Sequence, residues 1–152
     1  MNTNEEIVLA TFSDLSNEDL YEIMKLRVDI FVVEQNCPYP ELDNNDQKAW
    51  HLYLKKDDKI VSYARILFKE SSAAIGRVVT HKSYRGLGLS QTILAKAIET
   101  IKTKTKYTKI HLSAQFYIVD LYKKLGFKVV SEQYLEDNIP HVDMELKIPK
   151  SF

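Results

Sequence analysis

The chain has 152 residues, which is the size of one domain and enough to bury a core without disulfides or metal ions, so we expect residues 1–152 to form a single domain. Hydrophobic residues make up 45% and charged residues 28%, which is close to the globular average. The 21 basic residues balance the 21 acidic ones, so no surplus charge points to nucleic acid or to an anionic membrane as a partner.

The single cysteine, Cys37, excludes an internal disulfide and a multi-cysteine zinc site, and we predict no metal site. The first six residues are polar and acidic, unlike a signal peptide, and no apolar run reaches transmembrane length. These features predict a cytoplasmic protein, because a lone cysteine fits a reducing compartment.

The N-terminal third predicts a strand, a helix and a loop. Residues 7–12 are rich in β-forming side chains and predict the first strand. Apolar residues at helical spacing predict a helix over residues 17–31, capped by Ser16 with Asp19 as a weak capping box and broken near Val32. Prolines and Asn or Asp residues then predict an irregular loop over 37–46.

The remaining elements alternate between strands and helices. A turn at residues 55–59 joins two predicted strands as a hairpin, and Gly76 inside a third strand suggests a bulge or a close backbone approach. The predicted strands are 49–54, 60–68, 73–80, 110–114, 127–130 and 142–148, and the helices are 90–102 and 118–125. This order predicts an α/β (α+β) fold with one mixed sheet of about six to seven strands flanked by helices.

Residues 78–90 carry the clearest chemical signal, because a strand leads through a turn into a helix. Gly86 and Gly88 allow a tight bend, and the helix start adds unpaired N–H groups and a positive dipole end. Ser90 is small and is expected to cap this helix. The lysine of a P-loop and the third glycine of a dinucleotide fingerprint are absent. The glycines alone therefore leave an anion cradle and a plain strand–helix turn as equal alternatives.

Two motifs resemble those of the GCN5-related N-acetyltransferase (GNAT) superfamily. Arg85-x-x-Gly88-x-Ser90 is similar to its Gln/Arg-x-x-Gly-x-Gly/Ala signature, with Ser90 as a mild departure. Residues 121–127, Leu-Tyr-Lys-Lys-Leu-Gly-Phe, resemble its second signature. The ElaA-type branch is the nearer match, through segments 26–27, 32–39, 63–66, 75–78 and 139–141.

The resemblance implies an enzyme that moves an acetyl group from acetyl-CoA to a small amine or peptide, as a monomer or a homodimer. It places the pantetheine arm on the backbone of Val78, Val79 and Thr80, with the Val79 amide near the thioester carbonyl. It assigns the pyrophosphate to Arg85, Gly86, Leu87, Gly88, Leu89 and Ser90. Gln115, where many members carry Asn, is expected at the cofactor, and Tyr122 is the candidate general acid for the departing thiolate.

The general base is not identified by the motifs. Many family members carry a Glu on the strand before the bulge, whereas residues 73–75 here offer no acid. Glu34 and His111 are the two candidates we name as catalytic, and a water chain is the alternative. The other residues that the sequence offers for this role are His51, His81 and His141.

Charged residues in otherwise apolar segments form a further set, consisting of Arg27, Glu34, Asp43, Asp46, Arg65 and Arg77. They predict either an acceptor pocket wall or a structural ion-pair network, because buried charges are costly unless paired. Segment 26–31, together with Glu34, Asp43 and Asp46, also resembles the N-terminal pattern of acyl-homoserine-lactone synthases, which share the fold. The two alternative functions are therefore an acyl-homoserine-lactone-synthase-like acyltransferase and a non-catalytic acyl-CoA-binding protein.

Overall fold

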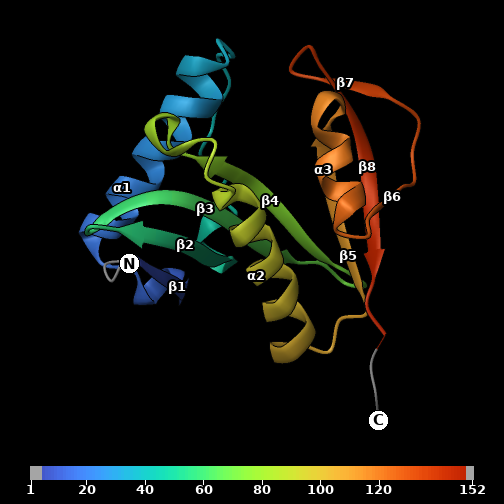
Figure 1. Ribbon diagram of the computed structural model, residues 1–152, viewed down its shortest axis with the longest axis horizontal. Helices are drawn as coiled ribbons and strands as arrows, with labels where there is room; N and C mark the ends of the chain where they lie inside the picture. The colour runs from blue at the N-terminus through green and yellow to red at the C-terminus, as the bar shows by residue number, and fades with distance from the viewer. Residues whose placement is uncertain (1–4, 150–152) are drawn as a thin grey trace.

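The computed structural model describes residues 5–149, so the two ends of the predicted 1–152 domain lie outside it. One mixed sheet of eight strands runs through the molecule in the order β1-β2-β3-β4-β5-β8-β6, with β7 paired to β8 (Figure 1). The strands are β1 Glu5–Thr11, β2 Trp50–Lys56, β3 Lys59–Phe68, β4 Ala73–Thr80, β5 Lys109–Gln115, β6 Lys128–Val129, β7 Tyr134–Glu136 and β8 Ile139–Lys147. The helices are α1 Asn17–Arg27, the π-helix η2 Val28–Glu34, α2 Leu89–Lys104 and α3 Val119–Lys124, with short 3₁₀ turns at Phe12–Asp14, Asp46–Lys48, Lys82–Tyr84 and Phe116–Ile118.

The predicted fold class is confirmed, with one strand more than the seven that the sequence indicated. The additional strand, β7, forms a hairpin with β8 through a two-residue turn at Asp137 and Asn138, both with positive φ (51° and 64°). The same geometry closes the predicted β2–β3 hairpin at Asp57 and Asp58. Asp and Asn tolerate the left-handed region, which this type of turn requires at both central residues.

Helix α1 begins as predicted but does not break near Val32. The Ser16 hydroxyl accepts a hydrogen bond from the backbone N–H of Asp19, 3.0 Å away, which confirms the cap. Beyond Arg27 the chain continues as the π-helix η2, and the Gln35 N–H bonds the Ile30 carbonyl at 3.0 Å. This wider turn carries the end of the helix to the edge of the site described below.

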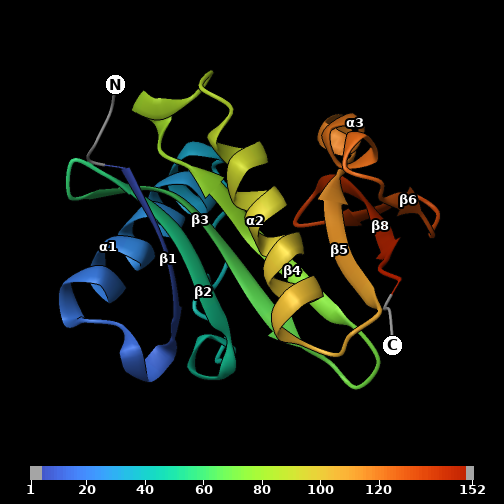
Figure 2. The same cartoon turned by 60° about the horizontal axis from the view of Figure 1, so that its bottom comes forward.

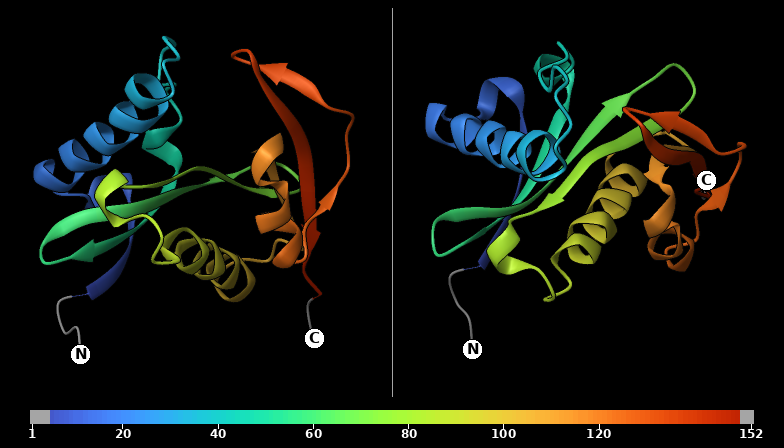
Figure 3. Two further views of the ribbon diagram at one scale, coloured as in Figure 1. Left: turned by 45° about the horizontal axis from the view of Figure 1, so that its top comes forward. Right: turned by 90° about the horizontal axis from the view of Figure 1, so that it is seen from above.

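The helices cover both faces of the sheet. Helices α2 and α3 pack on one face, where Ile93, Leu94, Ala97 and Tyr122 join the larger core cluster. Helix α1 packs on the other face in a separate cluster around Ile23, as the view from above shows (Figure 3, right). No helix within residues 5–149 has the length and apolar character needed to span a bilayer.

The sheet splits between its two central strands. Parallel pairing of β4 with β5 is limited to Ala73 with Ile110 and Ala74 with His111, after which the strands diverge (Figure 2). On the other side of β4, the register with β3 shifts at a bulge where Arg77 has a φ of 52°. The bulge expected in this strand is therefore present, one residue after Gly76. We call the diverging region between β4 and β5 the split, because it positions the site.

Candidate active site

A cavity of about 430 Å³ lies at the split, between the N-terminal and C-terminal halves of the sheet. The ribbon shows the end of η2 and the following loop facing the β7–β8 hairpin across this region (Figure 3, left). The N-terminal side contributes, among others, Phe31, Gln35, Tyr39, Arg65, Arg77 and Val78. The C-terminal side contributes, among others, His111, Ser113, Gln115, Tyr122, Glu136 and His141. The cavity thus brings together Val78, Gln115, Tyr122, His111 and His141, while Val79, Thr80, Glu34, His51 and His81 lie outside its lining.

The start of α2 has the geometry of an anion site. The backbone N–H groups of Leu89, Ser90 and Gln91 make no hydrogen bond to other residues of the described chain, as expected for the first turn of a helix. Gly86 and Gly88 have φ values of 84° and 74°, and a Cβ at either would meet no atom within 4 Å. Both glycines are therefore required by backbone conformation, and the space in front of them is open.

The expectation that Ser90 caps α2 is wrong. The helix begins one residue earlier than predicted, at Leu89, so its N-cap is Gly88, which has no side chain to offer. The Ser90 hydroxyl instead bonds the Thr80 hydroxyl at 2.7 Å, and Thr80 contacts the Ser62 hydroxyl at 3.1 Å. Ser62 in turn donates to the Val79 carbonyl. This chain of hydroxyls fixes the start of α2 to the end of β4 and leaves the first-turn amides without a side-chain cap.

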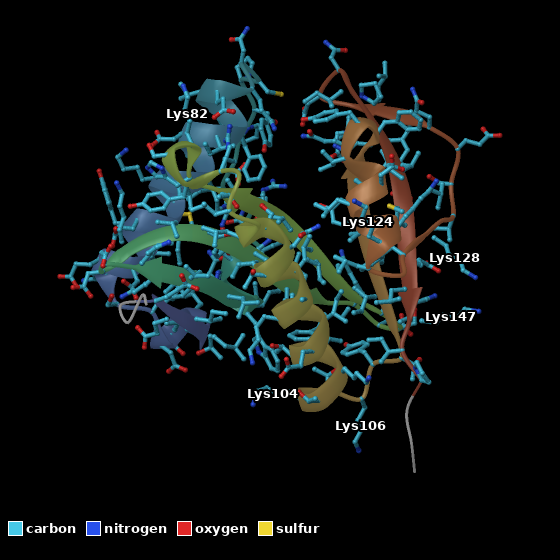
Figure 4. All side chains as sticks on the ribbon, viewed as in Figure 1. Lys82, Lys104, Lys106, Lys124, Lys128 and Lys147 are labelled. Atoms are coloured by element: carbon cyan, nitrogen blue, oxygen red, sulfur yellow. The ribbon has the colours of Figure 1, made fainter. Side chains whose placement is uncertain are left out.

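Arg85 and Glu34 form an ion pair beside this loop. Two guanidinium nitrogens lie 2.6 and 2.9 Å from the two carboxylate oxygens of Glu34, and Arg85 Nε bonds the Thr80 carbonyl at 3.4 Å. The hydrogen bonds from Arg85 lower the pKa of the Glu34 carboxyl, and Lys82 adds to this effect. Figure 4 shows Lys82 at the same end of the molecule. Glu34 thus lies beside the loop as the carboxylate partner of Arg85.

The three strand residues expected at the pantetheine arm differ in exposure. Val78 lines the cavity, whereas Val79 and Thr80 are buried at 3% and 8% exposure. Val79 packs in the α1 cluster and pairs with Tyr63 of β3. Because β5 does not pair with β4 beyond Ala74, the edge of β4 that faces the split is left without a strand partner.

Tyr122 of α3 lines the cavity with a buried ring. The side chain packs edge-on against Phe127, and its hydroxyl makes no hydrogen bond to any described residue. Burial raises the pKa of Tyr122 to about 12. The phenol is therefore protonated at any working pH and has its donor available for a ligand.

Gln115 lies at the open end of the split, at the end of β5. Its side-chain Nε2 lies 3.4 Å from the Gln35 side-chain oxygen, and its own oxygen accepts from the Tyr117 hydroxyl. Gln115 thus connects the C-terminal half of the sheet to Gln35, the residue that follows η2, across the cavity.

The histidines proposed as alternative bases occupy different environments. His51 is fully buried between the Tyr63 hydroxyl and the Asp46 carbonyl, and burial lowers its pKa. His81 accepts a hydrogen bond from the Ser83 N–H and caps a 3₁₀ turn. His111 and His141 both line the cavity. The His111 ring is about one-third exposed, with Nε2 3.8 Å from Asp143.

The predicted ion-pair set exists, with one member replaced. Arg27 is fully buried and bonds Glu41 at 2.8 Å and Asp46 at 2.7 Å. Arg65 bonds Asp43 at 2.8 Å and Asp46 at 3.1 Å, while its Nε has no partner among the described residues. Glu41 takes the place that the sequence assigned to Glu34. A lone Glu in a proline-containing loop gives no signal of burial, so Glu41 was not predicted.

Arg77 belongs both to the ion-pair network and to the cavity wall. Its Nε bonds Glu41 at 2.7 Å, and its guanidinium lies 5.8 Å from the ring centroids of both Phe31 and Tyr39. The side chain is one-quarter exposed and lines the cavity. The network is therefore structural at Arg27 and forms part of the cavity wall at Arg65 and Arg77.

The described residues fit a coenzyme A ligand and show no metal site. Free amides, two glycines in the left-handed region and the charges of Lys82 and Arg85 suit a pyrophosphate at the start of α2. The cavity at the split is lined by Val78 of β4 and by Tyr122. No group of three or more His, Cys, Asp or Glu side chains within residues 5–149 is arranged to hold a metal ion.

Comparison with known proteins identifies the family. The family model described as an acetyltransferase (GNAT) domain matches residues 10–148. A UPF0039 protein of Schizosaccharomyces pombe is 42% identical over 96% of this chain and 99% of its own length. A crystal structure of an acyl-CoA N-acyltransferase from Pseudomonas aeruginosa superposes with a TM-score of 0.90 at 35% identity, covering 93% of this chain and 99% of that one.

Protein ElaA of Escherichia coli is 37% identical over 90% of this chain and 92% of its own length. Its crystal structure has a TM-score of 0.88 and covers 94% of this chain and 99% of that one. The chain therefore belongs to the GNAT acetyltransferase superfamily, in its ElaA-type branch.

Proposed function

We propose that this protein transfers an acetyl group from acetyl-CoA to the amine of a small molecule or peptide by direct attack. The observation that carries this proposal is the combination of unpaired amides at the start of α2, an edge of β4 without a strand partner, and a cavity lined by Tyr122, whose hydroxyl has no partner among the described residues. The similar Pseudomonas aeruginosa structure is named an acyl-CoA N-acyltransferase, which supports an acyl-CoA donor.

The chain's own groups have separate tasks in this reaction. The amides of Leu89, Ser90 and Gln91 hold the pyrophosphate, with the loop from Arg85 to Gly88 around it. The resemblance assigned the thioester carbonyl to the Val79 amide, but the register of β3 and β4 directs that amide toward Tyr63. The Val78 amide, at the bulge and beside the cavity, is therefore our candidate for the thioester carbonyl, where a donor stabilises developing negative charge. These roles place the thioester at the bulge of β4, in reach of an amine in the cavity.

Tyr122 stabilises the thiolate leaving group. A thiol has an ordinary pKa of about 8.5, so complete transfer of a proton from a phenol with a pKa of about 12 to a thiolate is uphill. Burial therefore favours a hydrogen bond from the Tyr122 hydroxyl to the developing thiolate over full proton transfer. This sharpens the general-acid role expected from the sequence into hydrogen-bond stabilisation.

Two measurements test the proposal. Isothermal titration with acetyl-CoA and with adenosine measures cofactor binding, and we expect saturable binding of acetyl-CoA alone. A free-thiol assay with polyamines, amino sugars, peptides and arylamines then measures turnover, with longer acyl-CoA donors in parallel. Methylthioadenosine released from S-adenosylmethionine would favour the acyl-homoserine-lactone-synthase alternative. Binding without CoA release for every acceptor would favour a non-catalytic acyl-CoA-binding protein.

A further inference from the structure

The basic nitrogens of two histidines are already occupied. His51 has Nε2 2.9 Å from the Asp46 carbonyl, so that nitrogen carries the proton, and its Nδ1 accepts from the Tyr63 hydroxyl at 2.7 Å. His81 uses Nδ1 to accept the Ser83 N–H at 3.0 Å. Neither ring offers a free lone pair, so neither is suited to take a proton from a substrate.

In the neutral His141 ring, one hydrogen bond fixes the tautomer and leaves the lone pair of Nε2 free. Its Nδ1 lies 2.7 Å from the Ile139 carbonyl oxygen, which can only accept, so Nδ1 carries the proton of the neutral ring. The lone pair is therefore on Nε2, which receives no hydrogen bond from any described residue. The Glu136 carboxylate lies 3.6 Å from Nε2. The side chain is 8% exposed and lines the cavity.

The strand register places His141 at the open end of the split. The last pair between β4 and β5 joins Ala74 and His111, at the closed end. Four residues further along, β4 reaches Val78 at the bulge and β5 reaches Gln115. Gln115 pairs with His141 on β8. His141 is thus level with the bulge along the strands, whereas His111 is not.

The surroundings of His141 favour a cation. Two titratable groups contact it, namely Tyr134, which stacks on the ring at 6.1 Å between centroids, and Glu136 of the same hairpin. Asp143 bonds the Tyr134 hydroxyl, and the other titratable groups on the cavity wall, apart from the basic residues across the cavity, are Cys37, Tyr39, His111, Tyr122 and Asp137. No described lysine or arginine lines the cavity on this side. Across the cavity the charged lining residues are Arg65, Arg77 and Lys69, and the two arginines are ion-paired with acids.

We propose that Glu136 and His141 receive the acceptor as an alkylammonium ion and that His141 Nε2 takes its proton, so that the acceptor is a primary aliphatic amine and not an aromatic one. This inference rests on the proposed function. An aliphatic amine is charged at neutral pH and has no lone pair until it loses a proton, whereas an aromatic amine is already neutral. A neutral imidazole nitrogen with a free lone pair can take that proton and pass it to solvent.

The step balances without a further reactant. One ammonium proton moves to His141 Nε2, and the amine nitrogen then bonds the thioester carbonyl carbon. The carbon–sulfur bond breaks, and the second proton lost by the nitrogen goes to the thiolate that Tyr122 stabilises. The products are the amide, CoA thiol and one proton, which His141 releases to water.

Benzylamine and aniline test this assignment, because they differ by one methylene group and by charge at neutral pH. We expect wild-type protein to release CoA with benzylamine in preference to aniline. His141→Gln should lower kcat/KM for benzylamine about 100-fold at neutral pH, with recovery as the pH rises and the amine deprotonates itself. Its effect on aniline should be less than about tenfold. Glu136→Gln should raise KM for benzylamine and leave KM for aniline in place.

A second measurement does not depend on turnover. Long-range ¹H–¹⁵N spectra, assigned with the His141→Gln and His111→Gln variants, report which nitrogen of each ring carries the proton. We expect the Nδ1–H form for neutral His141. The Nε2–H form overturns the assignment, and so does a loss on benzylamine that follows His111→Gln in place of His141→Gln. A wild type that accepts aniline but no aliphatic amine also overturns it, whereas acetyl-CoA binding without CoA release for any amine overturns the proposed function itself.

Discussion

The guanidinium of Arg85 and the carboxylate of Glu34 face each other at two points, with nitrogen–oxygen distances of 2.6 and 2.9 Å. This pair joins the loop before α2 to the end of the π-helix η2, and the two residues lie 51 positions apart in the sequence. Both side chains are more than one-third exposed, so the pair contributes little to stability. The pair matters because the Glu34 carboxylate offsets the positive charge of Arg85 at the loop.

Glu34→Gln should tighten acetyl-CoA binding and leave turnover within a few-fold of wild type. The carboxylate offsets the Arg85 charge that a pyrophosphate would otherwise attract, so its removal strengthens the loop as an anion site. We expect Kd to fall by about two- to fivefold at low salt and the gain to shrink at high salt. Calorimetry at two ionic strengths measures this. A collapse of kcat with unchanged Kd would instead identify Glu34 as the general base.

Asp46→Asn should destabilise the fold strongly. Asp46 is the shared partner of Arg27 and Arg65, so the variant removes one negative charge that both buried guanidinium groups contact. Breaking a buried pair from one side costs about 3–5 kcal/mol. Urea unfolding with an unchanged m-value measures the loss. Asp29→Asn is the matched control, because Asp29 pairs with Lys25 at the exposed surface, and we expect no measurable change there.

The same network should make the protein sensitive to acid. Burial opposes ionisation of Asp43, but the hydrogen bonds from Arg65 outweigh it and hold the Asp43 pKa well below its usual 3.8. A carboxyl with a lowered folded pKa contributes stability that is fully present above the unfolded pKa and is lost as the pH falls through the folded pKa. Stability should therefore decline as the pH drops from about 5 toward 2.

Asp43→Asn tests this origin of the acid sensitivity. The variant should be less stable at neutral pH and should show a flatter decline in acid, because the titrating group is gone. Thermal unfolding across the acid range measures both effects. An unchanged slope would show that other carboxyls dominate.

Gly88→Ala should weaken acetyl-CoA binding about tenfold. The N-cap of α2 has a φ of 74°, which costs a residue with a Cβ about 1 kcal/mol, and relief of that strain turns the first-turn amides away from the pyrophosphate. Gly76→Ala is the control, since Gly76 lacks a left-handed φ and its added Cβ would meet no atom within 4 Å. Equal Kd values for both variants would contradict the pyrophosphate assignment.

Local patterns were sufficient to predict most of the fold. Apolar periodicity located the main helices and strands, and the Ser16 cap and the β2–β3 hairpin followed from turn and cap chemistry. The β7–β8 hairpin was not predicted, because a three-residue strand shows no clear alternation. Ser90 was misplaced because residues 88–90 offer two helix starts, and packing of its hydroxyl against Thr80 decides between them.

The site was less predictable than the fold because it depends on distant contacts. The Arg85–Glu34 pair and the role of Glu41 join residues that no local pattern relates. The tautomer of His141 depends on the carbonyl of Ile139, the first residue after the β7–β8 turn, and that turn was not predicted. Sequence motifs therefore indicated the donor site, and the candidate acceptor site required the register of β5 and β8.

Tyr122→Phe should separate catalysis from stability. The Tyr122 hydroxyl has no hydrogen-bond partner among the described residues, so its removal leaves no buried group unsatisfied, and we expect stability within about 0.5 kcal/mol of wild type. Acetyl-CoA Kd should also be retained, while kcat falls about 100-fold because the thiolate loses its donor. Tyr63→Phe is the control for a structural hydroxyl. It leaves His51 Nδ1 without its donor and should cost about 1–2 kcal/mol.

The pH profile of the same variant distinguishes a hydrogen bond from proton transfer. With a pKa of about 12, Tyr122 does not titrate in the range where the enzyme works, so an alkaline limb in wild-type kcat must come from another group. We therefore expect Tyr122→Phe to lower kcat by the same factor across the profile and to leave its shape intact. If the alkaline limb disappears in the variant, Tyr122 is transferring a proton at a pKa that the bound cofactor has lowered, and the general-acid role expected from the sequence is the correct one.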